Sequence, residues 1–388
     1  MSATYSEIGP TCRPLNARIP AGEECISLVT KRTYVMNGAT GKADPADDQL
    51  PLRSMPVFVG DDPNKLLIAD TEGWPYKLRT DVVVQGHVYG NGARRVDAAV
   101  VVGGARRDLT VSGDRQCSRT TGGRIVFSEP EPFDKMPLGY DRAYGGYDAG
   151  SEAAHPNLFE LIGPSLPAGT DPKIYSLCGY PRNRHGRGYY LSSSTTPIDE
   201  VQLPNIEAPE DLLVPERLVV ADPLAWWRQP VPAGVSWLHG SYIARCVYMG
   251  VKPFWQPLPD DLPEFERGYL SREARGIDVT REDPAVFGVQ SGGSLGLQLS
   301  HVGEGSVIRL VGMHPERQTA DVEVPAPPTI TVETRWRGAE IAPPALHHVE
   351  LYPDDGVFSV VWRGAVAARR TLLPEELDAL AFKVEWIS

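Results

Sequence analysis

The sequence predicts a mainly β protein, built as an antiparallel β-sandwich or as barrel-like sheets with long loops and a few short helices. Two observations predict this class. Short runs of alternating apolar and polar residues recur between turns over the first third of the chain and again after residue 286. Glycine (38) and proline (36) are both frequent among the 388 residues, which favours many turns and few long helices.

The clearest predicted strands lie in the first third. Residues 24–36 place Ile26, Leu28 and Tyr34 on one face, and Lys31 interrupts the pattern. Residues 96–104 and 106–114 follow as two further runs separated by a turn. Residues 81–92 end in an Asn91-Gly92 turn and place three valines on one face: Val82, Val84 and Val88.

The last hundred residues return to strands after a middle part that is rich in loops. The segment 347–364 predicts a hairpin with a turn at 353–356 and with Phe358, Val360 and Trp362 on its buried face. Residues 373–382 predict a short helix, because Pro374 suits its first turn.

These patterns suggest two parts of the chain. We expect residues 1–285 to form a large β-rich domain with a loop-rich, tryptophan-rich second half, in which 245–250 is one buried strand. Residues 286–388 are expected to form a C-terminal β region that ends in a short helix, either independent or packed as one unit with the first.

Composition excludes several classes of function. A formal net charge of -12 disfavours nucleic acid, which is bound by clustered Lys and Arg. No run of about 20 apolar residues suits membrane insertion. The five cysteines are scattered, and the first twenty residues lack the pattern of a signal peptide. We therefore expect a cytoplasmic protein.

No catalytic, cofactor-binding or metal-binding residue is predicted. The sequence at 292–296, GGSLG, fits G-x-S-x-G, but the alternation after it indicates a strand where a nucleophile elbow needs a helix. His347 and His348 are adjacent and would point to opposite faces of a strand. Three carboxylates lie close together in the sequence: Asp134, Asp141 and Asp148. A glycosidase needs two carboxylates at a defined separation, and sequence spacing in a loop fixes no such distance. No nucleotide-binding glycine motif occurs, so we expect no cofactor.

The segment 132–148, PFDKMPLGYDRAYGGYD, is predicted to be a structural turn. Arg142 can form a bidentate pair with Asp134, Asp141 or Asp148. Gly145 and Gly146 supply positive φ angles for a tight turn. We expect this loop also to present Tyr140, Arg142 and Tyr144 to a partner, since Tyr and Arg are frequent interface anchors.

Seven segments, taken in order, resemble a known family. They are KRTYVM (31–36), TEGWPYKLRTDVVVQGHVYGNG (71–92), LTVSGDRQC (109–117), PFDKMPLGYDRAYGG (132–146), NRHGRGYY (183–190), LPNIEAP (203–209) and the hairpin at 347–364. Together they resemble the family of domain of unknown function 2169, which is encoded beside type VI secretion tip genes. Two positions depart from its pattern: Cys117 replaces an aromatic residue, and Arg184-His185 replaces Pro-Val.

The resemblance implies a non-enzymatic adaptor or chaperone. Such a protein would bind a secreted effector or a PAAR tip and help to load it onto the VgrG spike. The motif residues that would build the fold or contact this partner are Phe133, Met136, Pro137, Leu138, Tyr140, Arg142, Tyr144, Gly145, Gly146, Asn183, Gly186, Arg187 and Gly188. Those given a structural role are Lys77, Asp81, Gly113, Asp114 and Arg115.

Two other functions remain open from the sequence. One is a carbohydrate-binding or carbohydrate-processing β protein, in which exposed tryptophans stack on sugars: Trp226, Trp227, Trp237 and Trp255. The other is a structural component that stays in the assembled secretion tip.

Overall fold

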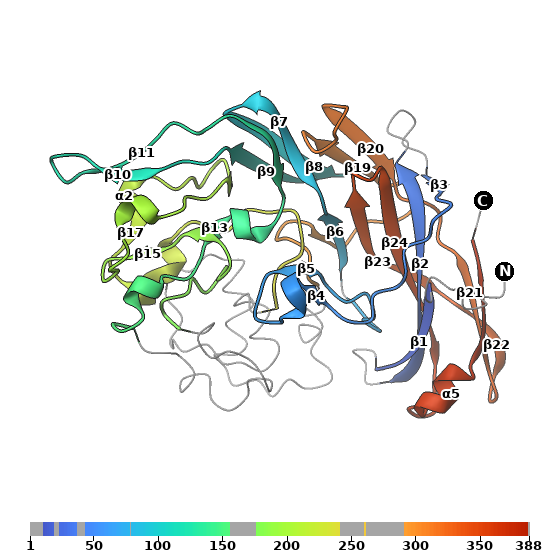
Figure 1. The fold of residues 1–388 in the computed structure, drawn as a ribbon. Helices are drawn as coiled ribbons and strands as arrows, with labels where there is room; N and C mark the ends of the chain where they lie inside the picture. The colour runs from blue at the N-terminus through green and yellow to red at the C-terminus, as the bar shows by residue number, and fades with distance from the viewer. Residues whose placement is uncertain are drawn as a thin grey trace.

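The computed structural model describes residues 11–18, 23–36, 43–77, 79–155, 176–240, 260 and 291–386. The fold is mainly β: of the described residues, 43% lie in strands and 9% in helices. Several sheets follow one another along the molecule, and those of the described residues form no closed barrel (Figure 1). The predicted fold class is confirmed.

The largest sheet has seven strands, with β3 paired to β2 beside the path β1-β2-β24-β23-β6-β18. Its members are β1 (Cys12–Arg18), β2 (Glu24–Met36), β3 (Ala43–Pro45), β6 (Thr80–Val84), β18 (Gln298–Leu299), β23 (Pro344–Tyr352) and β24 (Val357–Ala367). Strands β23 and β24 form the predicted hairpin, and Gly356 in its turn has a φ of 65°. The three residues predicted for its buried face, Phe358, Val360 and Trp362, are buried.

A five-stranded and a three-stranded sheet complete the main framework. The first, in the order β16-β9-β8-β19-β20, contains β8 (Arg95–Val102), β9 (Ala105–Ser112), β16 (Ile206–Glu207), β19 (Val307–Val311) and β20 (Thr319–Glu323). The second, in the order β22-β21-β25, contains β21 (Thr329–Thr334), β22 (Gly338–Ala342) and β25 (Ala381–Glu385).

Smaller pairs and short helices connect these sheets. The antiparallel pairs are β4 (Val57–Phe58) with β5 (Leu67–Ala69), β7 (His87–Ala93) with β12 (Phe133–Pro137), and β10 (Cys117–Arg119) with β11 (Ile125–Phe127). The parallel pairs are β13 (Tyr144–Gly145) with β14 (Arg187–Gly188), and β15 (Tyr190–Leu191) with β17 (Val219–Val220). In the described residues the α-helices are α2 (Pro215–Leu218) and α5 (Pro374–Asp378), and the 3-10 helices are η1 (Val59–Asp61), η2 (Tyr140–Arg142), η3 (Ala149–Ser151), η5 (Ile198–Glu200) and η6 (Pro223–Arg228).

Helix α5 confirms the predicted C-terminal helix and its start. Pro374 occupies the first turn, and the Glu376 carboxylate accepts a hydrogen bond from the Leu373 backbone N–H. The helix is shorter than predicted because β25 begins at Ala381 and pairs with β21.

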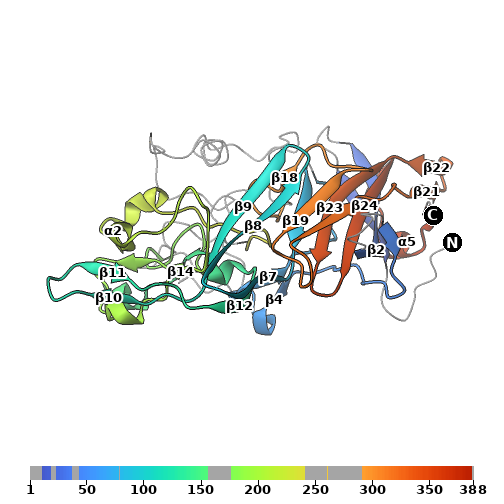
Figure 2. The same ribbon diagram turned by 90° about the horizontal axis from the view of Figure 1, so that it is seen from above.

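The main hydrophobic core lies between the seven-stranded and five-stranded sheets. It contains Val82, Val84 and Val88, as their shared face predicts, together with Leu109 and Leu310 from the other sheet. Figure 2 shows β8, β9 and β19 beside β23 and β24. A second core packs the three-stranded sheet against β2 through Leu28, Ile330 and other residues.

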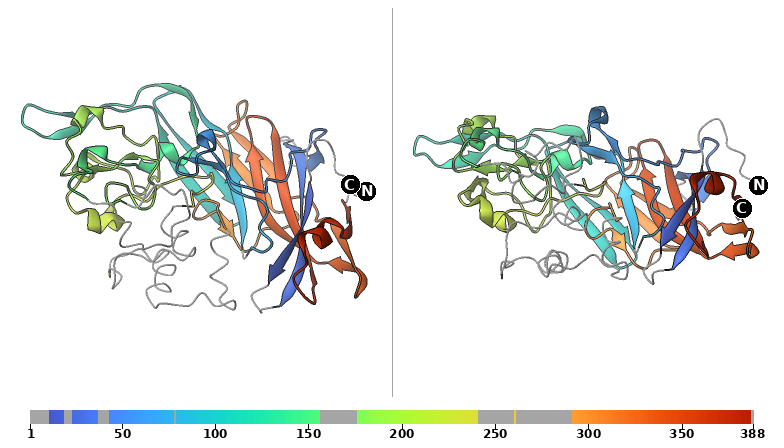
Figure 3. Two further views of the ribbon diagram at one scale, coloured as in Figure 1. Left: turned by 60° about the horizontal axis from the view of Figure 1, so that its bottom comes forward. Right: turned by 90° about the horizontal axis from the view of Figure 1, so that it is seen from below.

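A third core holds the loop-rich part of the chain at the opposite end of the molecule from β21 and β22 (Figure 3). It is aromatic: the ring centroids of Tyr144 and Tyr180 lie 5.0 Å apart, and those of Tyr180 and Tyr189 lie 5.3 Å apart. Trp226 is fully buried beside them. Aromatic packing therefore replaces regular sheets in this region.

Strands from both ends of the sequence share sheets. Strand β24 pairs with β2 from Cys25 to Val35, and β19 pairs with β8. The boundary predicted near residue 285, the predicted strand at 245–250 and Trp255 lie outside the described residues.

Because strands from both ends of the sequence share sheets, cleavage of the chain at one position should not separate its two parts. A recognition sequence for a site-specific protease, inserted near residue 285 and cleaved, should leave two fragments that stay associated in native buffer. The reason is that strand pairings and a common core join them across the cut. Size-exclusion chromatography before and after 6 M urea measures this, and separation of the fragments in native buffer would contradict it.

Candidate functional site

The two most specific family segments, 132–146 and 183–190, meet at the parallel pair β13–β14. Tyr144 lies opposite Arg187, and Gly145 lies opposite Gly188. The Gly146 N–H donates to Asn183 O at 2.8 Å, and the Tyr189 N–H donates to Gly145 O at 2.8 Å. Gly145 and Gly146 have φ angles of 142° and 116°, as the predicted tight turn requires.

Two buried polar side chains, Asn183 and Asp148, stabilise this turn through hydrogen bonds. The Asn183 carboxamide donates to Tyr140 O at 2.7 Å and to Tyr144 O at 3.1 Å. The buried Asp148 carboxylate accepts four hydrogen bonds, from the N–H groups of 150 and 191 and from the hydroxyls of 151 and 194. A fully satisfied buried carboxylate of this kind stabilises a loop rather than acting as an acid or base.

The tyrosines of the segment lie inside the protein. Tyr140 is 5% and Tyr144 1% exposed, and burial raises the pKa of both hydroxyls. The Tyr140 hydroxyl donates to Ser294 Oγ at 2.9 Å. Of the three residues expected to face a partner, Tyr140, Arg142 and Tyr144, only Arg142 reaches the surface, because the other two fill the core.

Arg142 does not make the predicted bidentate pair. Its Nε lies 3.5 Å from Asp141 Oδ2, while Asp148 is occupied by its own loop and Asp134 is exposed on β12. Instead Arg142 and Arg187 both point Nη1 at one acceptor, Asn205 Oδ1, at 3.5 and 3.2 Å. We call these two residues the arginine pair.

The arginine pair is half-buried and mutually repulsive. Burial and the positive charge of Arg142 lower the pKa of the Arg187 guanidinium. Arg187 Nη1 lies 3.6 Å from Asp114 Oδ1, whose own nearer partner is the Asn205 carboxamide at 2.9 Å. The predicted residues Asp114, Arg142 and Arg187 are thus brought together by Asn205, which sequence patterns alone did not single out.

The other motif residues are distributed between this site and the sheets. The aromatic ring of Phe133 covers Gly90, where a Cβ would lie 2.7 Å from it. Met136 and Leu138 enter the main core, and Pro137 pairs with His87 in β7. Gly186 approaches the Ala143 and Tyr144 carbonyls, where a Cβ would lie 2.5 Å from the first.

The GDR element at 113–115 anchors a neighbouring turn. A Cβ at Gly113 would lie 1.9 Å from Glu131 O, so only glycine fits. Arg115 pairs with the buried Glu207 at 2.6 Å. At the two positions that depart from the family pattern, Cys117 is buried in the aromatic core and Arg184 donates to Ser176 O at 2.9 Å.

Lys77 and Asp81 form an ion pair on the face of the seven-stranded sheet that lies away from the main hydrophobic core. Asp81 also accepts from the Gly292 N–H at 3.0 Å, which fixes the start of the GGSLG turn. Ser294 of that turn is buried and donates to Ser236 O at 2.8 Å. The rejected nucleophile elbow is therefore a structural turn.

The same face carries a buried ion-pair network that sequence patterns did not predict: Lys31, Arg53, Glu72, His348 and Glu350. Lys31 Nζ lies 2.7 Å and Arg53 Nη2 3.1 Å from Glu72 Oε1. Arg53 also binds Glu350 at 2.5 Å, and the Trp237 indole donates to Glu350 at 2.8 Å. The one signal in the sequence was Lys31, a charged residue that interrupts the strand pattern of residues 24–36.

This network contains a set of potential metal ligands. Oxygen or nitrogen atoms of Glu72, His348 and Glu350 lie within 4.8 Å of one another. Lys31 and Arg53 already neutralise the two carboxylates, so a divalent ion there would leave an excess of buried positive charge. The residues present fit an ion-pair network better than a metal centre.

Strand β23 has a bulge between Leu346 and His348, at the two adjacent histidines His347 and His348. Both imidazoles are buried, and the charge of Lys77 contributes to lowering the pKa of each, after burial itself. Within the described part of the chain, neither ring nitrogen of His347 has a hydrogen-bond partner.

This buried histidine predicts an acid-sensitive fold. Burial, and then Lys77 and Arg363, hold the pKa of His347 well below its usual value, so the folded state stays neutral where the unfolded state takes up a proton. Stability should be full above about pH 6.5 and should fall below it by about 1.4 kcal/mol per pH unit for each such group. Urea unfolding at pH 7.5 and 5.5 measures this.

The control is His347→Leu. Leucine cannot bind a proton, so the variant should lose less stability between these pH values. Two other histidines still contribute, because burial lowers the pKa of His348 and lowers the pKa of His185 to about 4. An unchanged slope would show that His347 does not titrate differently in the folded state.

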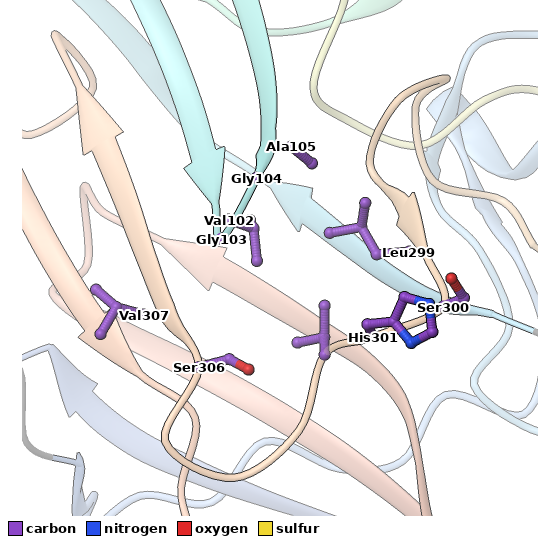
Figure 4. A pocket seen from close by; sticks show the side chains of 10 residues that line it. Val102, Gly103, Gly104, Ala105, Leu299, Ser300, His301, Ser306 and Val307 are labelled. Atoms are coloured by element: carbon purple, nitrogen blue, oxygen red, sulfur yellow. The ribbon is translucent and has the colours of Figure 1, made fainter.

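A shallow pocket opens at the end of the β8–β9 hairpin and has a volume of about 310 Å³ (Figure 4). Val102, Leu299, Val307 and small residues form its wall. Among its ten lining residues, His301 is the single titratable side chain, so the pocket has no second group for acid–base chemistry.

The tryptophans expected for sugar stacking are mostly unavailable. Trp226 and Trp237 are buried, the first beneath Arg182 and the second against His348 and Glu350. Trp227 is half-buried beside Trp226. An aromatic platform for a sugar needs an exposed ring face, which neither Trp226 nor Trp237 has.

An exposed apolar surface lies on the β4–β5 hairpin. We call it the hairpin patch, and it consists of Met55, Val57, Val59 and Ile68, with Met55 74% exposed. The inner side of the same hairpin packs through Phe58 and Leu67 against Trp237. Exposed apolar side chains grouped on one rigid element are typical of a protein-binding surface.

Together these observations define a β-rich protein whose motif residues build a rigid scaffold under a surface with an apolar patch and an arginine pair. A family model described as "Uncharacterized protein conserved in bacteria (DUF2169)" matches residues 21–363. The chain belongs to this family, as the resemblance predicted.

Two further comparisons complete this picture. Searches of curated proteins and of solved structures give no match to the chain. Among the described residues, no helix is long and apolar enough to span a membrane.

Proposed function

We propose that this protein is a non-enzymatic accessory of type VI secretion, an adaptor or chaperone that acts in the cytoplasm. It binds a secreted effector or a PAAR tip and helps to load that cargo onto the VgrG spike. The mechanism is reversible protein binding: the cargo is held, kept from misfolding and then released.

The observation that supports this proposal best is the division between scaffold and surface. The most specific motif residues, Asn183, Gly145 and Gly146 among them, are used to build a turn, and no nucleophile–base pair accompanies them in the described residues. The hairpin patch stands outside this scaffold as a rigid apolar surface. An apolar surface on a rigid support suits protein binding.

The resemblance supplies the kind of partner. The segments that carry it extend from residue 31 to residue 364, and the family match covers nearly the same part of the chain. The neighbourhood of type VI secretion tip genes that the resemblance implies gives the candidates: effector, PAAR tip and VgrG.

Co-purification tests the proposal. The tagged protein is expressed with the products of its neighbouring genes, and a stable complex with an effector or a PAAR tip is the expected result. Recovery of the pure protein alone, folded and without a partner, would contradict the adaptor function.

A surface variant locates the interface. Met55→Ser with Ile68→Ser should reduce the recovered partner about tenfold or more, because the apolar contacts are lost. Ile341→Ser is the matched control, since Ile341 is 71% exposed but lies on β22 in another sheet. Equal losses in both variants would remove the hairpin patch from the interface.

A further inference from the structure

We propose that the arginine pair, Arg142 and Arg187, is a binding site for a side-chain carboxylate of the protein partner. This inference rests on the proposed function for the identity of the partner. The site itself follows from the geometry of the two guanidinium groups and their surroundings.

The two guanidinium groups have more donors than acceptors. Nη1 of each arginine donates to the same oxygen, Asn205 Oδ1, at 3.5 Å for Arg142 and 3.2 Å for Arg187. The Nε of Arg142 is buried and has no hydrogen-bond partner among the residues that the structure describes. Guanidinium carries several N–H donors in a planar fork, which matches the two oxygens of a carboxylate.

The nearby carboxylates do not fill this site. Asp141 Oδ2 stays 3.5 Å from Arg142 Nε, beyond a good charge-assisted hydrogen bond, and its side chain is 38% exposed. Asp114 Oδ1 stays 3.6 Å from Arg187 Nη1, and its side chain is 66% exposed. Elsewhere in the same chain arginines make full pairs, for example Arg309 with both oxygens of Asp321 at 2.7 Å.

The scaffold holds the arginine pair in place. Arg142 ends η2, whose first carbonyl is held by Asn183, and Arg187 begins β14 beside Tyr144. Asn205 is itself fixed, since its carboxamide donates to Ser112 O at 3.1 Å and to Asp114 at 2.9 Å. Two cations fixed side by side bind an anion without a large ordering cost.

Two acidic residues flank the arginine pair. Asp114 Oδ1 lies 3.6 Å from Arg187 Nη1, and Asp141 Oδ2 lies 3.5 Å from Arg142 Nε. The flanking Asp114 and Asp141 favour a singly charged carboxylate over a doubly charged phosphate, because they repel the greater charge more.

Small anions test the site in the isolated protein. Sodium acetate at 50 mM should raise the unfolding temperature of the wild-type protein by about 2 °C or more over sodium chloride of equal ionic strength. The gain should vanish in Arg142→Gln/Arg187→Gln and persist in Arg106→Gln, a control whose exposed arginine pairs with Asp108. A phosphate gain as large as that of acetate would overturn the carboxylate assignment.

A second pair of variants separates charge from the fork geometry. Arg142→Lys/Arg187→Lys retains both charges but loses the planar forks, so at least half of the acetate gain should disappear. This variant also keeps the test valid if the glutamine variant is poorly folded. Full retention of the gain in both double variants would overturn the proposal.

Co-purification then links the site to the partner. The double glutamine variant should recover at least tenfold less partner than the wild-type protein, and the Arg106→Gln variant should recover the same amount. Undiminished recovery would overturn the inference and leave the proposed function intact. If the protein binds acetate but no partner co-purifies with it, the carboxylate site would be supported and the adaptor function would be contradicted.

Discussion

Replacing Glu72 by alanine should lower the free energy of unfolding by about 3–5 kcal/mol. Glu72 is fully buried and is the common partner of Lys31, Arg53 and His348. Its removal leaves the Lys31 ammonium, 1% exposed, without its carboxylate at 2.7 Å. A buried charge without its partner costs much more than the ion pair contributes when it is complete. Chemical denaturation with urea measures the change.

The matched control is Asp321→Ala. Asp321 accepts two hydrogen bonds from Arg309, but both side chains are partly exposed, so the loss should be about 1 kcal/mol or less. Equal effects of the two substitutions would show that burial adds nothing to the network. Lys31→Met/Glu72→Met, which removes both charges together, should be less destabilising than Glu72→Ala alone.

Acid titration probes the same carboxylate. Burial alone would raise its pKa, but the hydrogen bond from His348 and the charges of Arg53 and Lys31 lower the pKa of Glu72 to about 2. Its contribution to stability is therefore full above about pH 4.5 and is lost as the pH falls toward 2. In Glu72→Ala, this part of the pH dependence should be missing.

The strands were predictable where a short stretch of sequence contains both the turn residues and the alternating apolar residues. The hairpin of β23 and β24 has a turn sequence, alternating residues and a proline–glycine boundary within twenty residues, so local rules were sufficient. The same applies to Gly145 and Gly146, since a glycine pair after a tyrosine in a tight turn indicates positive φ.

The ion-pair network was not predictable, because its residues lie far apart in the sequence. Lys31, Glu72 and Glu350 come from three distant segments, and their contact depends on β23 pairing in parallel with β6. Sequence patterns contain no signal for a parallel pairing across more than 260 residues.

The candidate site could be predicted only in part. Arg142 and Arg187 were both identified through their motifs, but the predicted partners of Arg142 were its neighbours in sequence. Asn205 replaces them, because the turn before β16 brings its carboxamide between the two arginines. Tyr140 and Tyr144 were expected at the surface and instead fill the core, since an aromatic residue in a loop can satisfy its hydroxyl inside.

Replacing Gly145 by alanine is expected to cost about 3–5 kcal/mol and to reduce the soluble yield sharply. Two effects add at this position. Its φ of 142° is strained for any residue with a Cβ, and that Cβ would lie 2.1 Å from the Asn183 carbonyl oxygen. Relief requires β13 and β14 to separate, which breaks the turn that holds Asn183 and the arginine pair.

Two other glycines of the chain separate these effects. Gly104→Ala should change the free energy of unfolding by less than about 0.5 kcal/mol, because its Cβ meets nothing within 4 Å and its φ is ordinary. Gly103→Ala carries a φ of 56° without a clash, so it should cost about 1 kcal/mol from the backbone alone. If Gly145→Ala costs no more than Gly103→Ala, the close approach to Asn183 does not exist in solution. A cost several times larger would establish that the two motif segments are locked together as the structure describes.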